Sequence, residues 1–165
     1  MQVAAFVVSM WKVFEDFVTT AIAEVLASRP GRTVPQHECY LDRPLPNRAS
    51  VVKMAVDLVH LDPRERPQII FDAKYKYADA SGRYPNADHY QMLGYCTALR
   101  VDRAWLIYAQ GSGQPVERHV INSDVVIAEY PLDLRAAPKD LLAQIELLAL
   151  RAWASRAQMR ASAVG

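Results

Sequence analysis

Two charged residues, Asp72 and Lys74, close an apolar run and could act together in chemistry. Alternate residues of a strand point to the same face, about 7 Å apart, so Asp72 and Lys74 would project together while Phe71 and Ala73 point the other way. Burying a carboxylate or an ammonium is unfavourable unless it has a partner or a function. Asp57, near the end of the preceding apolar run, would complete a site for metal-assisted cleavage of a phosphodiester.

That chemistry needs a divalent metal to polarise the phosphoryl oxygens and to lower the pKa of a bound water. Magnesium takes oxygen ligands, often one or two carboxylates together with water and substrate phosphate. Asp57 and Asp72 would supply the carboxylates for Mg²⁺, with Mn²⁺ as a substitute, and the backbone carbonyl of Ala73 could be a third ligand. Lys74 could orient the attacking water or stabilise transition-state charge. No proton-transfer role follows for Lys74, because its neighbours could shift its pKa either way.

Three further polar residues fit the same scheme. Glu15 falls inside the apolar sector of a predicted helix, where it could reach the sheet and bind the metal or its water. Gln91 and Tyr95 are four residues apart and so share one face of a second helix. They could contact the backbone of a bound strand or orient the carboxylates.

Each of these residues also has a simpler interpretation. An Asp-x-Lys pair at a strand end is more often a surface ion pair worth under ~1 kcal/mol. Glu15 could reach solvent at the edge of its helix, and Gln91 could be the capping partner of Asp88. The simpler interpretation is favoured for each residue alone, whereas the set in this order favours a site.

The predicted elements that must position these residues run in the order helix, strands, helix, strands, helix. We expect helices at residues 10–28, 89–100 and from Pro138, and strands at 33–41, 50–61, 68–77, 103–109, 116–121 and 125–130. The turn at 62–67 predicts an antiparallel hairpin of the second and third strands, and loops are expected at 78–85 and 111–113. Ser9 and Asp88 are the expected helix caps. The pattern indicates a mixed sheet with helices on its faces, in the α/β or α+β class.

Two helices have predicted core stripes. For the first helix the stripe is Trp11, Phe14, Val18, Ile22 and Val25; for the last it is Leu141, Leu142, Ile145, Leu148 and Ala152. The pattern fades after Ser155, so we expect one domain over residues 1–165, with its core at about 10–153 and a frayed tail.

Composition limits the class of protein. With 165 residues, 52% of them hydrophobic, and 19 basic against 18 acidic residues, the chain is typical of a soluble globular domain. The net charge of +1 gives no general affinity for nucleic acid, so DNA binding would need clustered cations or another subunit. Cys39 and Cys96 belong to no C-x-x-C pair and are expected to be buried thiols. The apolar start lacks a basic region and predicts neither signal peptide nor membrane anchor, so the cytoplasm is expected.

Four segments, at residues 10–18, 56–59, 71–76 and 88–95, together resemble the nuclease domain of the McrC family. The most specific are the Asp-Ala-Lys-Tyr-Lys segment that begins at Asp72 and the Asp-x-Tyr-Gln-Met segment that begins at Asp88. McrC is the cleavage subunit of a 5-methylcytosine-specific restriction system, in the PD-(D/E)XK nuclease superfamily. The resemblance implies a restriction-endonuclease-like α/β/α fold with a central mixed sheet, and Mg²⁺-dependent endonuclease cleavage of DNA.

Matching these motifs gives each site residue an implied role. The resemblance assigns Asp57, Asp72 and Lys74 to the catalytic core and Glu15 to the acid of the first helix. Gln91 and Tyr95 match a Gln-x-x-x-Tyr motif and, with Lys76, are expected to contact the substrate. Val56 departs from the pattern, since many relatives have proline there, at a structural position.

The resemblance also implies partners. In the family a GTPase motor translocates and triggers cleavage, and a separate N-terminal region of the nuclease subunit contacts that motor. This chain begins close to its nuclease-like part, so we do not expect that region here. A homodimer on DNA would supply the two active sites that double-strand cleavage usually needs. A different class remains open, a non-catalytic interaction module that retains the scaffold, and metal binding would separate the two.

Overall fold

The computed structural model describes residues 2–76, 86–109 and 113–162, with side chains for residues 10–156 of these ranges. The loop predicted at 78–85 and most of the one at 111–113 lie outside the described residues. In chain order the elements are α1 (Gln2–Leu26), β1 (Arg32–Tyr40), β2 (Lys53–Leu61), β3 (Pro67–Lys74), α2 (Asn86–Leu99), β4 (Arg103–Ala109), β5 (Val116–His119), β6 (Val126–Leu132) and α3 (Pro138–Ser162).

The described strands form one mixed six-stranded sheet in the order β1-β2-β3-β4-β6-β5. The central strands β3, β4 and β6 are parallel, and β1, β2 and β5 are attached antiparallel. Helix α2 connects β3 to β4, as a parallel pair requires. The predicted mixed sheet and the predicted antiparallel hairpin of β2 and β3 are both confirmed.

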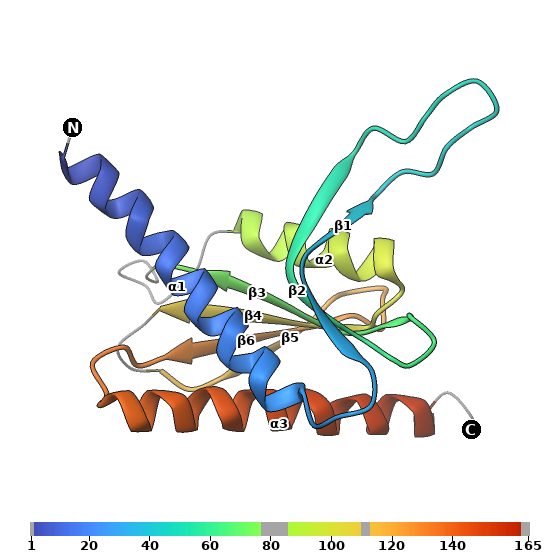
Figure 1. Cartoon of the computed structure of the whole chain (residues 1–165). Coiled ribbons are helices and arrows are strands. Elements are labelled where there is room, and N and C mark those ends of the chain that lie inside the picture. The colour runs from blue at the N-terminus through green and yellow to red at the C-terminus, as the bar shows by residue number, and fades with distance from the viewer. Residues whose placement is uncertain (1, 77–85, 110–112, 163–165) are drawn as a thin grey trace.

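Helices cover both faces of this sheet (Figure 1). One core, which we call the α1/α3 core, joins α1 and α3 to the sheet through residues such as Phe14, Phe71 and Leu148. The other, the α2 core, joins α2 to the opposite face through residues such as Val56 and Met92. The domain is therefore an α/β fold in three layers, as expected. No helix in the described part of the chain is both long enough and apolar enough to cross a bilayer.

Helix α1 begins earlier than predicted. It runs from Gln2 through Ser9, so Ser9 is not its cap, because the apolar residues before it contain no helix breaker. Val18 and Ile22 are buried as predicted, and so is Glu15, at 6% exposure. Trp11 is 52% exposed instead and packs in neither core.

Helix α3 also differs from its prediction. It continues to Ser162, beyond the expected fraying at Ser155, because Ala, Arg, Gln and Met favour helix there. Ile145 and Leu148 are buried as predicted, whereas Leu142 is 49% exposed.

The strand bounds place the site residues. Strand β2 starts at Lys53, not at residue 50, because the chain before it belongs to a ribbon that projects from the sheet (Figure 1). Strand β3 ends at Lys74, so Lys76 lies just beyond it. Cys39 and Cys96 are buried free thiols, as expected.

Candidate active site

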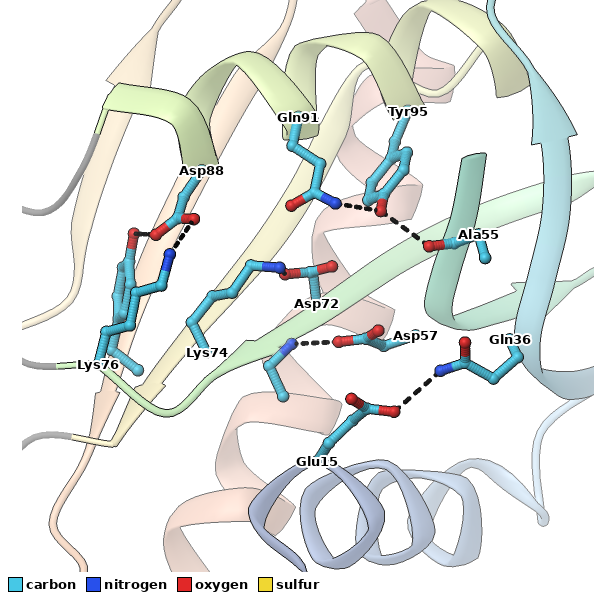
Figure 2. A network of polar contacts seen from close by, with 12 residues as sticks. Glu15, Gln36, Ala55, Asp57, Asp72, Lys74, Lys76, Asp88, Gln91 and Tyr95 are labelled. Carbon is cyan, nitrogen blue, oxygen red and sulfur yellow. Dashed lines mark hydrogen bonds and ion pairs between the residues drawn. The ribbon is translucent and has the colours of Figure 1, made fainter. Parts of the chain in front are cut away.

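The candidate site lies where β2 and β3 separate. The last paired residues at this end of the two strands are Leu58 and Phe71, so Asp57 and Asp72 come directly after the ladder. Strand β3 continues beside β4 as far as Lys74. The backbone N–H of Ala73 donates instead to Asp57 Oδ2, at 2.9 Å, so a side chain takes the place of the neighbouring strand (Figure 2).

The side chains of β2 change from one face of the sheet to the other at the same point. Leu58 packs in the α1/α3 core, whereas Val56 packs in the α2 core. Residues two apart in a regular strand would face the same side. The twist at Asp57 turns this carboxylate into the gap between the strands.

A pocket of about 390 Å³ occupies the separation. The side chains or backbone of all the residues that the sequence predicts for the site line it: Glu15, Asp57, Asp72, Ala73, Lys74, Lys76, Gln91 and Tyr95. Trp11, Lys12, Gln36, Ala55 and Tyr75 complete the lining. Residues from α1, β1, β2, β3 and α2 thus meet at one place.

Asp72 is the most buried acid of the pocket, at 1% exposure. Burial raises its pKa to about 7, and the negative charge of Asp57 acts in the same direction. Lys74 Nζ lies 2.7 Å from Asp72 Oδ2 as an ion pair. The other oxygen, Oδ1, has no hydrogen-bond partner among the described residues. A buried carboxylate in this condition is unusual and indicates a missing cationic or donor group.

The neighbouring charges act on Asp57 and Lys74. Burial raises the pKa of Asp57, the Ala73 N–H opposes that effect, and the charge of Glu15 adds to it. Burial lowers the pKa of Lys74, but the acids Asp72, Asp57 and Asp88 together outweigh burial and hold the net pKa above its ordinary value. Lys74 is therefore an ammonium at neutral pH.

Glu15 reaches the pocket from α1. Its Oε1 accepts hydrogen bonds from Lys12 Nζ and from Gln36 Nε2, each at 2.9 Å. Lys12 is three residues before Glu15 on the same helix, whereas Gln36 lies on β1. The acid of the first helix is thus tied to the sheet.

Gln91 and Tyr95 form a chain of hydrogen bonds from α2 to β2. Gln91 Nε2 donates to Tyr95 Oη at 2.7 Å, and Tyr95 Oη donates to the Ala55 carbonyl at 2.8 Å. Tyr95 is 1% exposed, and its burial raises the pKa of the phenol. Tyr95 therefore braces the helix against β2, and Gln91 lies on the exposed side of this brace.

Asp88 is not the helix cap that the sequence predicts. Because α2 starts at Asn86, Asp88 lies inside the first turn, where its Oδ1 accepts from Lys76 Nζ at 2.8 Å and its Oδ2 from Tyr108 Oη at 3.3 Å. Gln91 bonds to Tyr95, so the predicted capping box is also wrong. Sequence inspection missed both the role of Asp88 in holding Lys76 and the presence of Gln36. The partners of both residues lie far away in the sequence, so no regular spacing pointed to them.

The donor set fits a hard divalent cation. Asp57 and Asp72 are two neighbouring carboxylates. The observation that favours a metal is the buried Asp72 Oδ1, which has no donor among the described residues. Within the described residues no three His, Cys, Asp or Glu side chains are grouped closely enough to hold a metal by themselves. Two carboxylates suit Mg²⁺, which keeps several waters and binds phosphate, better than a metal that needs an all-protein cage.

Comparison with known proteins agrees with this fold. Residues 1–109 match the model of a family described as McrBC 5-methylcytosine restriction system component. A chain in the refined half-complex of Thermococcus gammatolerans McrB AAA+ hexamers with bound McrC has the same fold, with a TM-score of 0.63 and 17% sequence identity over 86% of this chain. The match spans about a third (33%) of that chain, and no curated protein matches the sequence significantly. Because the family model covers well over half of its residues, the chain belongs to the McrBC 5-methylcytosine restriction system component family.

Proposed function

We propose that this chain is the DNA-cleaving domain of a restriction system, a Mg²⁺-dependent endonuclease that hydrolyses phosphodiester bonds. The observation that carries the proposal is the buried Asp72, whose Oδ1 has no hydrogen-bond donor among the described residues, beside Asp57 and Lys74 in an open pocket. Membership of the McrBC family supports a role in restriction.

Asp57 and Asp72 would hold the metal, together with the backbone carbonyl of Ala73. When bound there, Mg²⁺ would polarise the phosphoryl oxygens and lower the pKa of a water. The metal would also neutralise two acids whose pKa values burial now raises.

The surrounding residues have separate tasks in this proposal. Lys74 is protonated at neutral pH, so it supplies positive charge where charge develops on the phosphate and does not accept a proton. Lys76, held by Asp88, would contact the DNA backbone at the rim of the pocket. Glu15 would bind the metal or a water on it, and the exposed side of Gln91 would contact the bound strand.

A motor partner would explain how a nearly neutral chain engages DNA. The net charge is only +1, so phosphate neutralisation by this chain alone is limited. The structural neighbour comes from an assembly of McrB AAA+ hexamers with bound McrC. We infer that this chain likewise works with a McrB-type GTPase, in the cytoplasm where its DNA substrate would be.

Cleavage is tested on plasmid DNA with Mg²⁺ or Mn²⁺, first with the chain alone and then with its McrB-type motor and GTP. Asp72→Ala and Lys74→Ala should lose cleavage. Lys139→Ala, which removes an exposed cation on α3, is the control for Lys74 and should cleave like the wild type. Equal cleavage by wild type, Asp72→Ala and Lys74→Ala would contradict the assignment.

Metal binding gives a readout that needs no partner. Calorimetry with Mn²⁺ should show binding heat for the wild type and none for Asp57→Ala or Asp72→Ala. An Asp62→Asn variant changes another buried acid, at the turn between β2 and β3, and should bind like the wild type. No heat, with no cleavage in the presence of motor and GTP, would favour the non-catalytic module.

A further inference from the structure

Gln36 has an unusual backbone in the middle of a strand. Its φ is +48°, in the left-handed region, although it lies inside β1 and is not a glycine. Residues other than glycine rarely adopt this conformation, because the Cβ approaches the following carbonyl. Such strain persists when the surrounding structure enforces it, and it is concentrated at functional sites.

The strained residue lies directly across from Asp57. The pairs that flank it are Pro35 with Leu58 and His37 with Val56, so the Gln36–Asp57 position falls between them without a ladder pair of its own. The side chains of β1 change from one face of the sheet to the other here, as those of β2 do. A regular strand would place Val34 and Cys39 on opposite faces, but both pack against the α2 core. Both strands therefore twist at the same level, at Gln36 on β1 and at Asp57 on β2.

The side chain of Gln36 connects two acids of the pocket. Its Nε2 donates to Glu15 Oε1 at 2.9 Å, which links β1 to α1. The same amide lies close to Asp57, which is directly across from Gln36 on the neighbouring strand. The contact engages one Glu15 oxygen and leaves the other turned towards Asp57 and the end of β3 (Figure 2).

We propose that Gln36 is a positioning residue of the candidate active site, which uses its left-handed backbone to hold Glu15 and Asp57 in register with each other. The proposal rests on the proposed nuclease function. An amide is suited to this task because it donates hydrogen bonds to carboxylates without adding a charge that would compete with a metal. Partners of this kind, one step removed from a metal, typically change affinity or activity by about 10–100-fold when mutated.

Gln36→Gly separates the side chain from the backbone. Glycine adopts a φ of +48° without strain, so the variant should fold and lose only the amide. We expect kcat to fall, and the Kd for Mn²⁺ measured by calorimetry without DNA to rise, each by about 10–100-fold. KM for DNA should stay unchanged. Glu38→Gly, on the same strand but outside the pocket, is the matched control and should keep wild-type values.

A double-mutant comparison tests the contact itself. In a Glu15→Ala background, Gln36→Gly should have a smaller effect than in the wild type, because the Glu15 contact has gone and only the Asp57 contact remains to be lost. A wild-type enzyme that cleaves while Gln36→Gly matches it in kcat and in the Kd for Mn²⁺ would overturn the positioning role and leave the proposed function intact. Full additivity of the two changes would also overturn it. A wild type that neither binds Mn²⁺ nor cleaves would overturn both proposals.

Discussion

Two buried acids, Asp72 on β3 and Glu129 on β6, lie at the same level of the sheet with opposite surroundings. Both are paired in register with Leu106 of the strand between them, and they are 1% and 3% exposed. Glu129 accepts from Arg118 Nε at 3.0 Å and Nη2 at 3.3 Å, and His89 Nε2 lies 2.6 Å from its Oε1. Asp72 has Lys74 on one side and the acids Asp57 and Asp88 close by.

The difference shows that burial alone does not identify a functional carboxylate. The protein itself neutralises Glu129 with a guanidinium that is fixed by two hydrogen bonds. Asp72 faces more negative charge than one lysine offsets. We interpret Glu129 as a structural residue and Asp72 as a residue that binds a cation when the site is functional.

The largest expected effect is on catalysis. Asp72→Asn should reduce cleavage by about 10³-fold or more, since loss of even one electrostatic group in an active site costs about 10²–10³-fold. Glu129→Gln, which keeps an acceptor for Arg118, should cleave at a rate near that of the wild type. Single-turnover cleavage rates at saturating Mg²⁺ measure both. A comparable loss of cleavage in the two variants would contradict the distinction between a functional Asp72 and a structural Glu129.

The next effect is on stability. Glu129→Ala leaves Arg118 and His89 without their shared carboxylate and should lower the free energy of unfolding by about 2 kcal/mol, at the low end for buried pairs because Arg118 is half exposed. The melting temperature should fall by roughly 4–8 °C. Glu117→Ala, an exposed acid on β5, is the control. An equal loss in metal-free Asp72→Ala would contradict the comparison.

A further effect should appear in the pH dependence of stability without metal. The folded pKa of Asp72, about 7, is above the unfolded value of about 3.9, so the folded state binds more protons between these values. Wild-type stability from this group should therefore fall as pH rises from about 4 to about 7. The free energy of unfolding of Asp72→Asn should exceed that of the wild type most at about pH 8, and the excess should disappear towards about pH 4. Urea unfolding with chelator present measures the difference, and a pH-independent gap would contradict it.

Asp62 supplies the smallest effect, in the opposite direction. This acid is also buried, but it accepts from the backbone N–H groups of Arg66 and Arg64 and from the Arg66 side chain. The Arg66 backbone bond is the main cause that lowers its pKa to about 2. Its stabilisation should be present above about pH 4 and be lost as pH falls towards about 2. In Asp62→Asn the free energy of unfolding should depend less on pH over that range. The same pH dependence in the variant and the wild type would contradict this prediction.

Much of the fold could be predicted from the order of patterned segments. The continuous apolar run of β4 and the polar turn between β2 and β3 gave the strand positions and the hairpin, since these signals are local. Errors came where tertiary contacts decide: Trp11 fits the apolar stripe, but it lines the open pocket and stays half exposed. Asp88 has cap chemistry, but Lys76 and Tyr108 bind it inside the helix.

The candidate site divides in the same way. Residue types and spacing were enough to select Glu15, Asp57, Asp72 and Lys74, because an acid in an apolar pattern is visible in a sequence. Gln36 could not be selected, since its partners are 21 residues away on α1 and on the neighbouring strand. Its left-handed backbone also carries no sequence signature.

By itself, the sequence determined which acids and lysine are available and that each is carried on an apolar element. This follows because hydrophobic periodicity and the cost of burying charge act through neighbours along the chain. Only the tertiary structure decided that β2 and β3 separate at Asp57. It also decided that Asp72 Oδ1 has no donor among the described residues, whereas both Glu129 oxygens have one. Those outcomes depend on strand register and on contacts between distant segments, which no local pattern encodes.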